Sequence, residues 1–134
     1  MSFYETPFAV WTIRGEAEGE PYNGKCAVGE VIRTRAKLYR QTFIEVIFAP
    51  WQFSFWNSDS KRRADVILQD DPATNPLFLE CLKAWIDSEH TAYSGGATHY
   101  VNLALVKAPP WAATMEQTAV VGQHTFYKER ITNV

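Results

Sequence analysis

The spacing of apolar residues predicts helices over the first two-thirds of the chain. Periods close to 3.6 residues run through residues 7–15, 23–37 and 42–48, and a weaker pattern covers residues 60–69. A stronger helix is expected to open at Asn75-Pro76 and to end near Glu89. The segment 23–37 combines the longest apolar stripe with charged positions, so we expect it to form the central core helix.

Individual residues indicate where these helices begin and end. Thr6 is the expected N-cap of the first helix, and Gly15 and Gly19 are expected to loosen the chain after it. Pro50 ends the helix at 42–48, because the residue before a proline is pushed out of helical geometry. The basic residues of the central helix are expected to point outward; they are Lys25, Arg33, Arg35 and Lys37.

After Gly95-Gly96 the pattern changes to short β-prone runs. Residues 97–102 and 118–121 read as strands, and Gly122-Gln123 is expected to turn the second of them into residues 124–127. The sequence therefore predicts an α+β fold that is mostly helical and carries a small antiparallel β-hairpin near its end.

Composition changes this picture little. A chain of 134 residues, 46% of them hydrophobic, fits one compact domain over residues 1–134, since two domains would each be too small. The net charge of -2 argues against binding to nucleic acid or to an anionic membrane surface. Cys26 and Cys81 fall at apolar helix positions, so buried thiols are expected, with a disulfide between them as the alternative.

No targeting or membrane segment is recognised. Residues 1–7 lack a basic region before an apolar run, and no stretch of 18 consecutive apolar residues occurs in the sequence. We therefore expect a protein made in the cytoplasm without a signal peptide and without membrane insertion. Action outside the cytoplasm would then require release by another protein.

Three carboxylates spaced by small residues follow the first predicted helix: Glu16, Glu18 and Glu20. A glycosidase needs a carboxylic acid fixed at the rim of a cleft, and a helix end followed by Gly-rich chain can hold one. Trp11 lies about one turn before Glu16 and could desolvate it, which would keep the acid protonated near neutral pH. Glu16 is the candidate catalytic acid, and a solvated turn is the alternative.

Six short blocks follow one another along the chain, and their order is more specific than any one of them. They are Gly15–Tyr22, Ala27–Arg35, Gln52–Ser54, Gly96–Asn102, Trp111 and Gly122–Tyr127. Together they resemble the cell-wall hydrolase family of the spore cortex-lytic enzymes (SleB/CwlJ type), which is also found in phage and prophage lysins. The resemblance covers roughly residues 8 to 127.

This resemblance implies a lysozyme-like, lytic transglycosylase-like domain that cuts peptidoglycan glycan strands between N-acetylmuramic acid and N-acetylglucosamine. It also implies that the catalytic acid is the first Glu of a Gly-Glu-x-x-Gly-Glu motif, which is Glu16 here. We expect the chain to depart from the family in two ways, with Glu18 where Arg is usual and with no separate peptidoglycan-binding domain ahead of the catalytic one.

A glycan cleft needs aromatic platforms beside amide and hydroxyl groups. Tyr100 and Asn102 alternate onto one strand face, and His99 is expected to face the other way. His124 is expected to support the hairpin through a buried hydrogen bond. For Phe53, the alternative to substrate binding is packing in the core. For Glu20, the alternative is a solvated position in a turn. The expected substrate-binding residues are Glu20, Gln52, Phe53, Ser54, Trp56, Tyr100, Asn102 and Trp111.

A second catalytic carboxylate has no clear candidate. Asp59, Asp70 and Asp71 are the Asp residues considered in the middle of the chain, and none of them lies in a family motif. This favours a mechanism in which Glu16 protonates the leaving group and the N-acetyl or C6 hydroxyl group of the substrate completes the reaction. Hydrolysis and transglycosylation both stay open.

Two other functions are alternatives. A zinc amidase would use His90, His99 and His124 as ligands and Glu16 as base, but their spacing matches no paired-ligand motif, and we expect no metal or cofactor. A noncatalytic glycan-binding module would use the aromatic loop. The basic clusters 33–37 and 61–63 are expected to be solvated helix faces, with contact to wall phosphates or acidic stem peptides as the alternative.

The favoured prediction is a monomeric peptidoglycan glycosidase. We expect it to act as a phage or prophage endolysin that reaches the cell wall after holin-type release.

Overall fold

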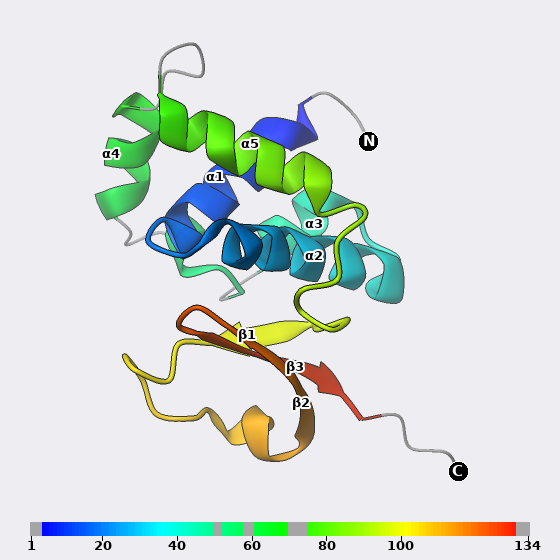
Figure 1. Cartoon of the computed structure of the whole chain (residues 1–134). Helices are drawn as coiled ribbons and strands as arrows, with labels where there is room; N and C mark the ends of the chain where they lie inside the picture. The colour runs from blue at the N-terminus through cyan, green and yellow to red at the C-terminus, as the bar shows by residue number, and fades with distance from the viewer. Residues whose placement is uncertain (1–3, 50–51, 58–60, 70–74, 131–134) are drawn as a thin grey trace.

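The computed structural model describes residues 4–49, 52–57, 61–69 and 75–130. Helices fill the first two-thirds of the chain and a three-stranded sheet follows (Figure 1). The α+β, mostly helical class expected from the sequence is confirmed. The helices are α1 Glu5–Ala17, α2 Tyr22–Tyr39, α3 Phe43–Ile47, α4 Lys61–Gln69 and α5 Pro76–Asp87, with 3₁₀ turns η1 Ser54–Trp56 and η2 Pro110–Ala113. The strands are β1 His99–Val101, β2 Met115–Val121 and β3 His124–Glu129.

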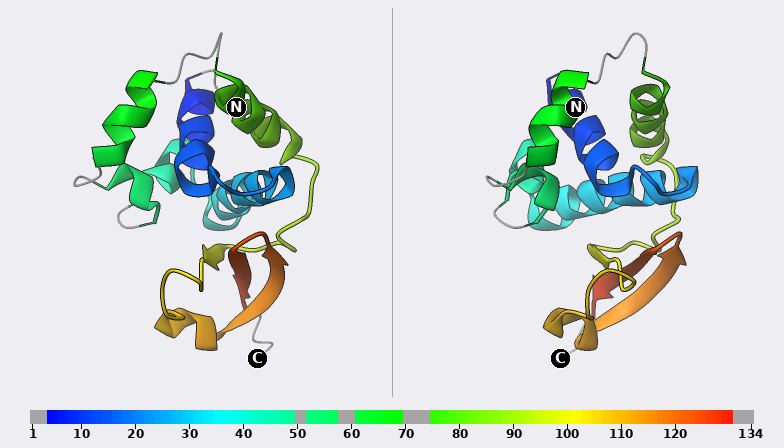
Figure 2. Two further views of the ribbon diagram at one scale, coloured as in Figure 1. Left: turned by 60° about the vertical axis from the view of Figure 1, so that its left-hand side comes forward. Right: turned by 90° about the vertical axis from the view of Figure 1, so that its left-hand side faces the viewer.

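Helix α2 lies between the other helices and the sheet (Figure 2). Its apolar residues divide between two faces because both sides of the helix are covered. Val28 and Ile32 join the main helical core with residues of α1 and α5. Ala27 and Val31 pack instead against Phe126 of β3 and its neighbours. The predicted role of this segment as the central core helix is confirmed.

The sheet is antiparallel with strand order β1-β3-β2. Strands β2 and β3 form a hairpin whose turn residue Gly122 has a φ of 58°, a left-handed conformation that glycine adopts without strain. Strand β1 pairs with the other edge of β3, so that Tyr100 lies opposite Phe126. The predicted turn at Gly122-Gln123 is therefore confirmed, and β1 extends the hairpin to a third strand.

The start of α1 differs from the prediction. The helix begins at Glu5, and its N-cap is Tyr4 without a side-chain hydrogen bond, so Thr6 lies inside the helix and is not the cap. Gly15 does not loosen the chain. It belongs to α1, and a Cβ atom there would overlap the ring of Phe55, so glycine is needed for the close approach of η1.

The caps of two later helices follow the sequence closely. Thr42 accepts a hydrogen bond from Glu45 N, and the Glu45 side chain accepts one from Thr42 N, which forms a capping box at α3. Asn75 caps α5 through Leu77 N.

The basic residues of α2 do not all point outward as predicted. Because both faces of α2 are covered, three of these long side chains reach backbone carbonyls instead of water. Lys25 Nζ donates to Glu20 O at 2.5 Å, and Arg35 Nε donates to Thr98 O at 2.5 Å. Arg33 donates to Trp85 O at 2.7 Å with its guanidinium stacked 3.8 Å from a Trp85 ring centroid. Only Lys37 of this set is exposed, so a solvated helix face is wrong for the other three.

Three further expectations concern the two cysteines, membrane-spanning helices and the basic cluster 61–63. Cys26 and Cys81 are both buried and are not joined by a disulfide. Among the helices in the described ranges, none has the length and hydropathy that spanning a membrane requires. The side chains of Lys61 and Arg62 lie outside what the structure describes.

Candidate active site

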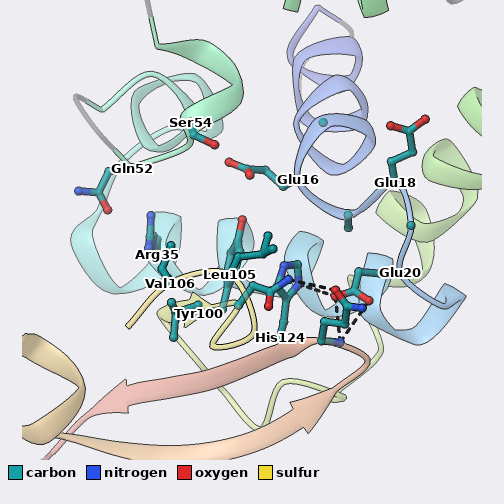
Figure 3. Close-up of a pocket in the computed structure, with 16 residues that line it drawn as sticks. Glu16, Glu18, Glu20, Arg35, Gln52, Ser54, Tyr100, Leu105, Val106 and His124 are labelled. Carbon is teal, nitrogen blue, oxygen red and sulfur yellow. Dashed lines mark hydrogen bonds and ion pairs between the residues drawn. The ribbon is translucent and has the colours of Figure 1, made fainter. Parts of the chain in front are cut away.

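A cleft of about 910 Å³ lies between the end of α1, helix α2, the η1 segment and the sheet (Figure 3). Seven of the residues proposed from the sequence line it, from four separate parts of the chain. They are Glu16, Glu20, Gln52, Ser54, Tyr100, Asn102 and His124. The cleft therefore brings together residues that are more than one hundred positions apart.

Glu16 occupies the last turn of α1 and is half-buried. Its side chain extends toward the side of the cleft that carries Ser54 and Gln52 (Figure 3). The helix end is held from behind, because its neighbour Gly15 packs against Phe55 and the next residue, Ala17, is buried in the helical core. The structure thus places the carboxyl group of Glu16 on a fixed helix end beside the cleft.

The other two carboxylates of the motif have different surroundings. Glu18 points away from Glu16 (Figure 3) and pairs with Arg14 at 2.7 Å, one helical turn earlier. The Glu20 side chain is only 9% exposed and accepts hydrogen bonds from Gln123 N, at 3.1 Å to Oε1 and 3.2 Å to Oε2. Glu20 thereby ties the α1–α2 connection to the β2–β3 turn, and its side chain is buried rather than solvated.

His124 supports the cleft in a different way than expected. Its Nδ1 lies 3.3 Å from Glu20 Oε1, but without the alignment of a hydrogen bond. The imidazole packs instead on the Tyr100 ring, with centroids 4.8 Å apart, and on the Phe126 ring at 6.1 Å. Burial lowers the pKa of His124, and the negative charge of Glu20 opposes that shift. The His124 imidazole is therefore neutral and packs against rings of β1 and β3.

Arg35 is the main cleft residue that the sequence analysis did not select. It is 6% exposed, lines the cleft, and stacks over the Phe53 ring at 5.3 Å. Burial lowers its pKa, while the charges of Tyr100, Tyr39 and Glu16 oppose that shift. One signal was present in the sequence: Arg35 follows Val31 by four positions, which places both on the helix face that meets the sheet.

Tyr100 of β1 shares this electrostatic environment. Burial and then the negative charge of Glu16 raise its pKa well above the ordinary value, against the positive charge of Arg35. The hydroxyl is therefore a proton donor at all physiological pH values. Other cleft residues that the sequence analysis did not propose for binding are the apolar pair Leu105 and Val106, together with Val101 and Gln123.

Three proposed aromatic platforms are not brought to the cleft. Phe53 is 1% exposed and belongs to the helical core, which was its alternative. Trp56 donates its indole N–H to Thr12 Oγ1 at 2.7 Å and packs among helical aromatics. Trp111 packs on His99 and Tyr127, with ring centroids 5.0 and 5.3 Å apart. Each of these three rings packs against other residues of the protein and does not line the cleft.

The three histidines of the metal alternative lie apart from one another. His90 is exposed beside Glu89, His99 stacks on Trp111, and His124 lies at the β2–β3 turn. Within the described ranges, no group of three or more His, Cys, Asp or Glu residues could hold a metal ion.

The carboxylates that line the cleft are Glu16, Glu18 and Glu20, as far as the structure describes the chain. The candidate second acids Asp59, Asp70 and Asp71 lie outside the described residues.

Residues 19–127 match the protein family described as Cell Wall Hydrolase. The spore cortex-lytic enzyme of Oceanobacillus iheyensis is 30% identical over 118 residues, which cover 87% of this chain and 38% of that protein. The spore cortex-lytic enzyme of Bacillus subtilis is 28% identical, over 85% of this chain and 34% of that protein. The chain thus spans little more than a third of these relatives.

Two solved structures share the fold over nearly the whole chain. The catalytic domain of the germination-specific lytic transglycosylase SleB from Bacillus anthracis has a TM-score of 0.73 and 27% identity, covering 96% of this chain and 97% of that domain. The catalytic domain of the Bacillus cereus SleB protein has a TM-score of 0.75 and 28% identity, covering 95% and 91%. The lysozyme-like fold and the family resemblance expected from the sequence are both confirmed.

Proposed function

Because the chain belongs to the cell wall hydrolase family, we propose that it is a peptidoglycan glycosidase that uses Glu16 as its general acid. The bond cleaved is the β-1,4 linkage between N-acetylmuramic acid and N-acetylglucosamine. The chain covers 97% of a domain described as the catalytic domain of a lytic transglycosylase, which supports an activity of that class. The family match begins at residue 19, so Glu16 rests on its own structural argument.

The observation that carries the proposal is the position of Glu16 among the three cleft carboxylates. Glu18 is engaged by Arg14, and Glu20 is engaged by the β2–β3 turn. Glu16 is half-buried on the end of α1 and extends toward the side of the cleft that carries Ser54 (Figure 3). It is the member of the set whose position fits proton transfer to a bound glycan.

In the proposed reaction, the Glu16 carboxyl group donates its proton to the glycosidic oxygen as the bond from that oxygen to C1 of the muramic sugar breaks. The C6 hydroxyl of the same sugar then attacks C1, and its proton passes to the Glu16 carboxylate. The products are a free hydroxyl on the glucosamine side and a 1,6-anhydro muramic end. Water in place of the C6 hydroxyl would give hydrolysis with the same proton balance.

A one-acid mechanism agrees with the geometry described so far. A retaining glycosidase needs a second carboxyl group about 5 Å from the acid, and an inverting one needs it roughly 6.5 to 9.5 Å away. Among the described residues that line the cleft, the two remaining carboxylates have the structural partners given above. The nucleophile is therefore proposed to come from the substrate.

The test compares Glu16→Gln with Glu18→Gln on purified peptidoglycan. Loss of positioned acid catalysis removes roughly 10²- to 10⁴-fold in rate, so Glu16→Gln should abolish release of soluble glycan while its thermal unfolding and wall binding stay unchanged. Glu18→Gln is the matched control and should keep most of the activity. Full activity in Glu16→Gln would exclude the proposed role, and wall binding without glycan release by the wild type would favour a noncatalytic binding module.

Delivery to the wall as a phage or prophage endolysin, and a monomeric state, are further proposals. Expression in a bacterial host should cause lysis only together with a holin, and size-exclusion chromatography should give the mass of one chain. Lysis without a holin, or a dimer peak, would contradict them.

A further inference from the structure

Two buried hydrogen-bond donors in the cleft have no partner in the described part of the chain. Arg35 uses its Nε on Thr98 O, but its Nη1 is buried without a hydrogen bond. The hydroxyl of Tyr100 is buried without one as well. Both residues line the same cleft as Glu16, and the charges of Glu16 and Arg35 both act on the Tyr100 hydroxyl (Figure 3).

Such donors are uncommon in folded proteins. Leaving a buried polar group without a hydrogen bond destabilises the folded protein, and more so when the group is charged. The two donors come from α2 and β1, and the hydrogen bond from Arg35 Nε to Thr98 O ties α2 to the residue that precedes β1. Their joint placement indicates an acceptor that arrives with the ligand.

The charge of the cleft selects the kind of acceptor. Three carboxylates line it, Glu16, Glu18 and Glu20, and among the described lining residues Arg35 is the positively charged side chain, since His124 is neutral. A second full negative charge beside Glu16 would be repelled. A neutral carbonyl oxygen, which has two lone pairs, can accept from both a guanidinium and a hydroxyl.

We propose that Arg35 Nη1 and the Tyr100 hydroxyl bind the carbonyl oxygen of an acetamido group on the glycan, beside the bond that Glu16 cleaves. This inference rests on the proposed function. It makes the two residues determinants of specificity for N-acetylated sugars, because a site built to hydrogen-bond a substrate group rejects analogues that lack it.

The experiment measures binding to two neutral tetrasaccharides by titration calorimetry, in a Glu16→Gln parent so that no turnover occurs. One ligand is the β-1,4 tetramer of N-acetylglucosamine, and the other is the β-1,4 tetramer of glucose, which lacks the acetamido groups. The parent should bind the acetylated tetramer more tightly. Adding Tyr100→Phe, which removes only the hydroxyl, should weaken that binding about tenfold and leave glucose tetramer binding unchanged.

Tyr39→Phe is the matched control, because the Tyr39 hydroxyl donates to Glu129 at 2.9 Å and the residue does not line the cleft. It should leave both affinities as they are. Equal weakening of both ligands by Tyr100→Phe, or no weakening, would overturn the subsite. A parent that binds both tetramers equally, or that binds neither, would overturn the subsite while the proposed function, which is measured on peptidoglycan, stands.

Discussion

The two walls of the cleft are built very differently. The helical wall ends in Glu16 and is backed by the large core of α1, α2 and α5, in which Ile13 and Trp85 are fully buried. The sheet wall is backed by a much smaller apolar cluster, and its loop exposes Leu105 at 79% and Val106 at 54%. Regions with few buried apolar contacts open more easily. The proposed acid therefore lies on the rigid wall, whereas Tyr100 and Asn102, which are proposed to contact the sugar, lie on the adaptable one.

Charged side chains join the two walls. Besides Arg35 with Thr98 O and Glu20 with Gln123 N, the buried carboxylate of Glu30 accepts from Ser94 N at 2.9 Å and from the Thr91 hydroxyl at 2.6 Å. Hydrogen bonds to charged groups contribute more than neutral ones, about 1.5–3 kcal/mol each. The two walls are thus joined by these polar contacts as well as by the small apolar cluster, whereas the position of Glu16 depends on the larger helical core.

The largest effect is expected from adding a methyl group to the tightly packed helical wall. A methyl group at Gly15 would overlap the ring of Phe55, which is 4% exposed and has little room to move. Overpacking of this kind costs about 3 kcal/mol, so Gly15→Ala should lower the thermal midpoint by about 10 °C. It should also reduce glycan release strongly, since Glu16 is the next residue.

Gly19→Ala provides the matched control for this prediction. A Cβ atom at Gly19 meets nothing within 4 Å, so the substitution should leave the midpoint unchanged or raise it slightly. Equal midpoints for the two variants would show that packing at Gly15 does not hold the wall in place.

Weakening the polar connection between the walls should have an intermediate effect. Glu20→Gln keeps the side-chain shape but removes the charge that faces Gln123 N and His124. We expect a loss of about 1–3 kcal/mol in urea unfolding, together with a several-fold drop in activity as the sheet wall shifts. Glu18→Gln should lose less, about 1 kcal/mol or below, because the Glu18 side chain is 40% exposed although its partner Arg14 is buried. If Glu20→Gln were no less stable than Glu18→Gln, the proposed tie between the walls would be wrong.

The smallest expected effect is a pH dependence of the sheet wall. Burial lowers the pKa of His124, and burial together with the positive charge of Arg35 lowers that of His99. The unfolded chain binds these protons below about pH 6.5, before the folded one does, so stability is lost as the pH falls below that value. Between pH 7.5 and 5.5 we expect the free energy of unfolding to drop by about 1 kcal/mol.

Urea unfolding at the two pH values measures this loss. His124→Gln should flatten the dependence, and His90→Gln, at an exposed position, should leave it as in the wild type. A stability that stays constant or rises toward pH 5.5 would contradict the burial of neutral imidazoles in this wall.

Much of the fold could be predicted from local sequence because its signals are local. The apolar period of α2, the capping box at Thr42 and the glycine turn at Gly122 each depend on neighbouring residues. Gly15 shows the limit of such reasoning. The same residue type that opens a turn elsewhere lies inside a helix here, because a ring forty positions away packs against it.

For the same reason, some of the residues that line the cleft could be predicted from the sequence and others could not. Polar residues at turns and strand ends, such as Gln52 and Asn102, stay near the surface wherever the chain goes, and they line the cleft. Aromatic residues such as Trp56 and Trp111 can serve a sugar platform or a core, and only tertiary packing decides between the two. Arg35 was expected to be solvated because its spacing from Val31 places it on one helix face but does not show that a sheet covers that face.

The most direct test of the central role of Glu16 is mass spectrometry of the soluble products from purified peptidoglycan treated with the wild type and with Glu16→Gln. The account predicts glycan fragments with anhydro-muramic ends from the wild type and none from the variant. Reducing muramic ends from the wild type would keep Glu16 as the acid and make water the nucleophile. Glycan release by Glu16→Gln at the wild-type rate, or no glycan fragments from the wild type, would contradict the account.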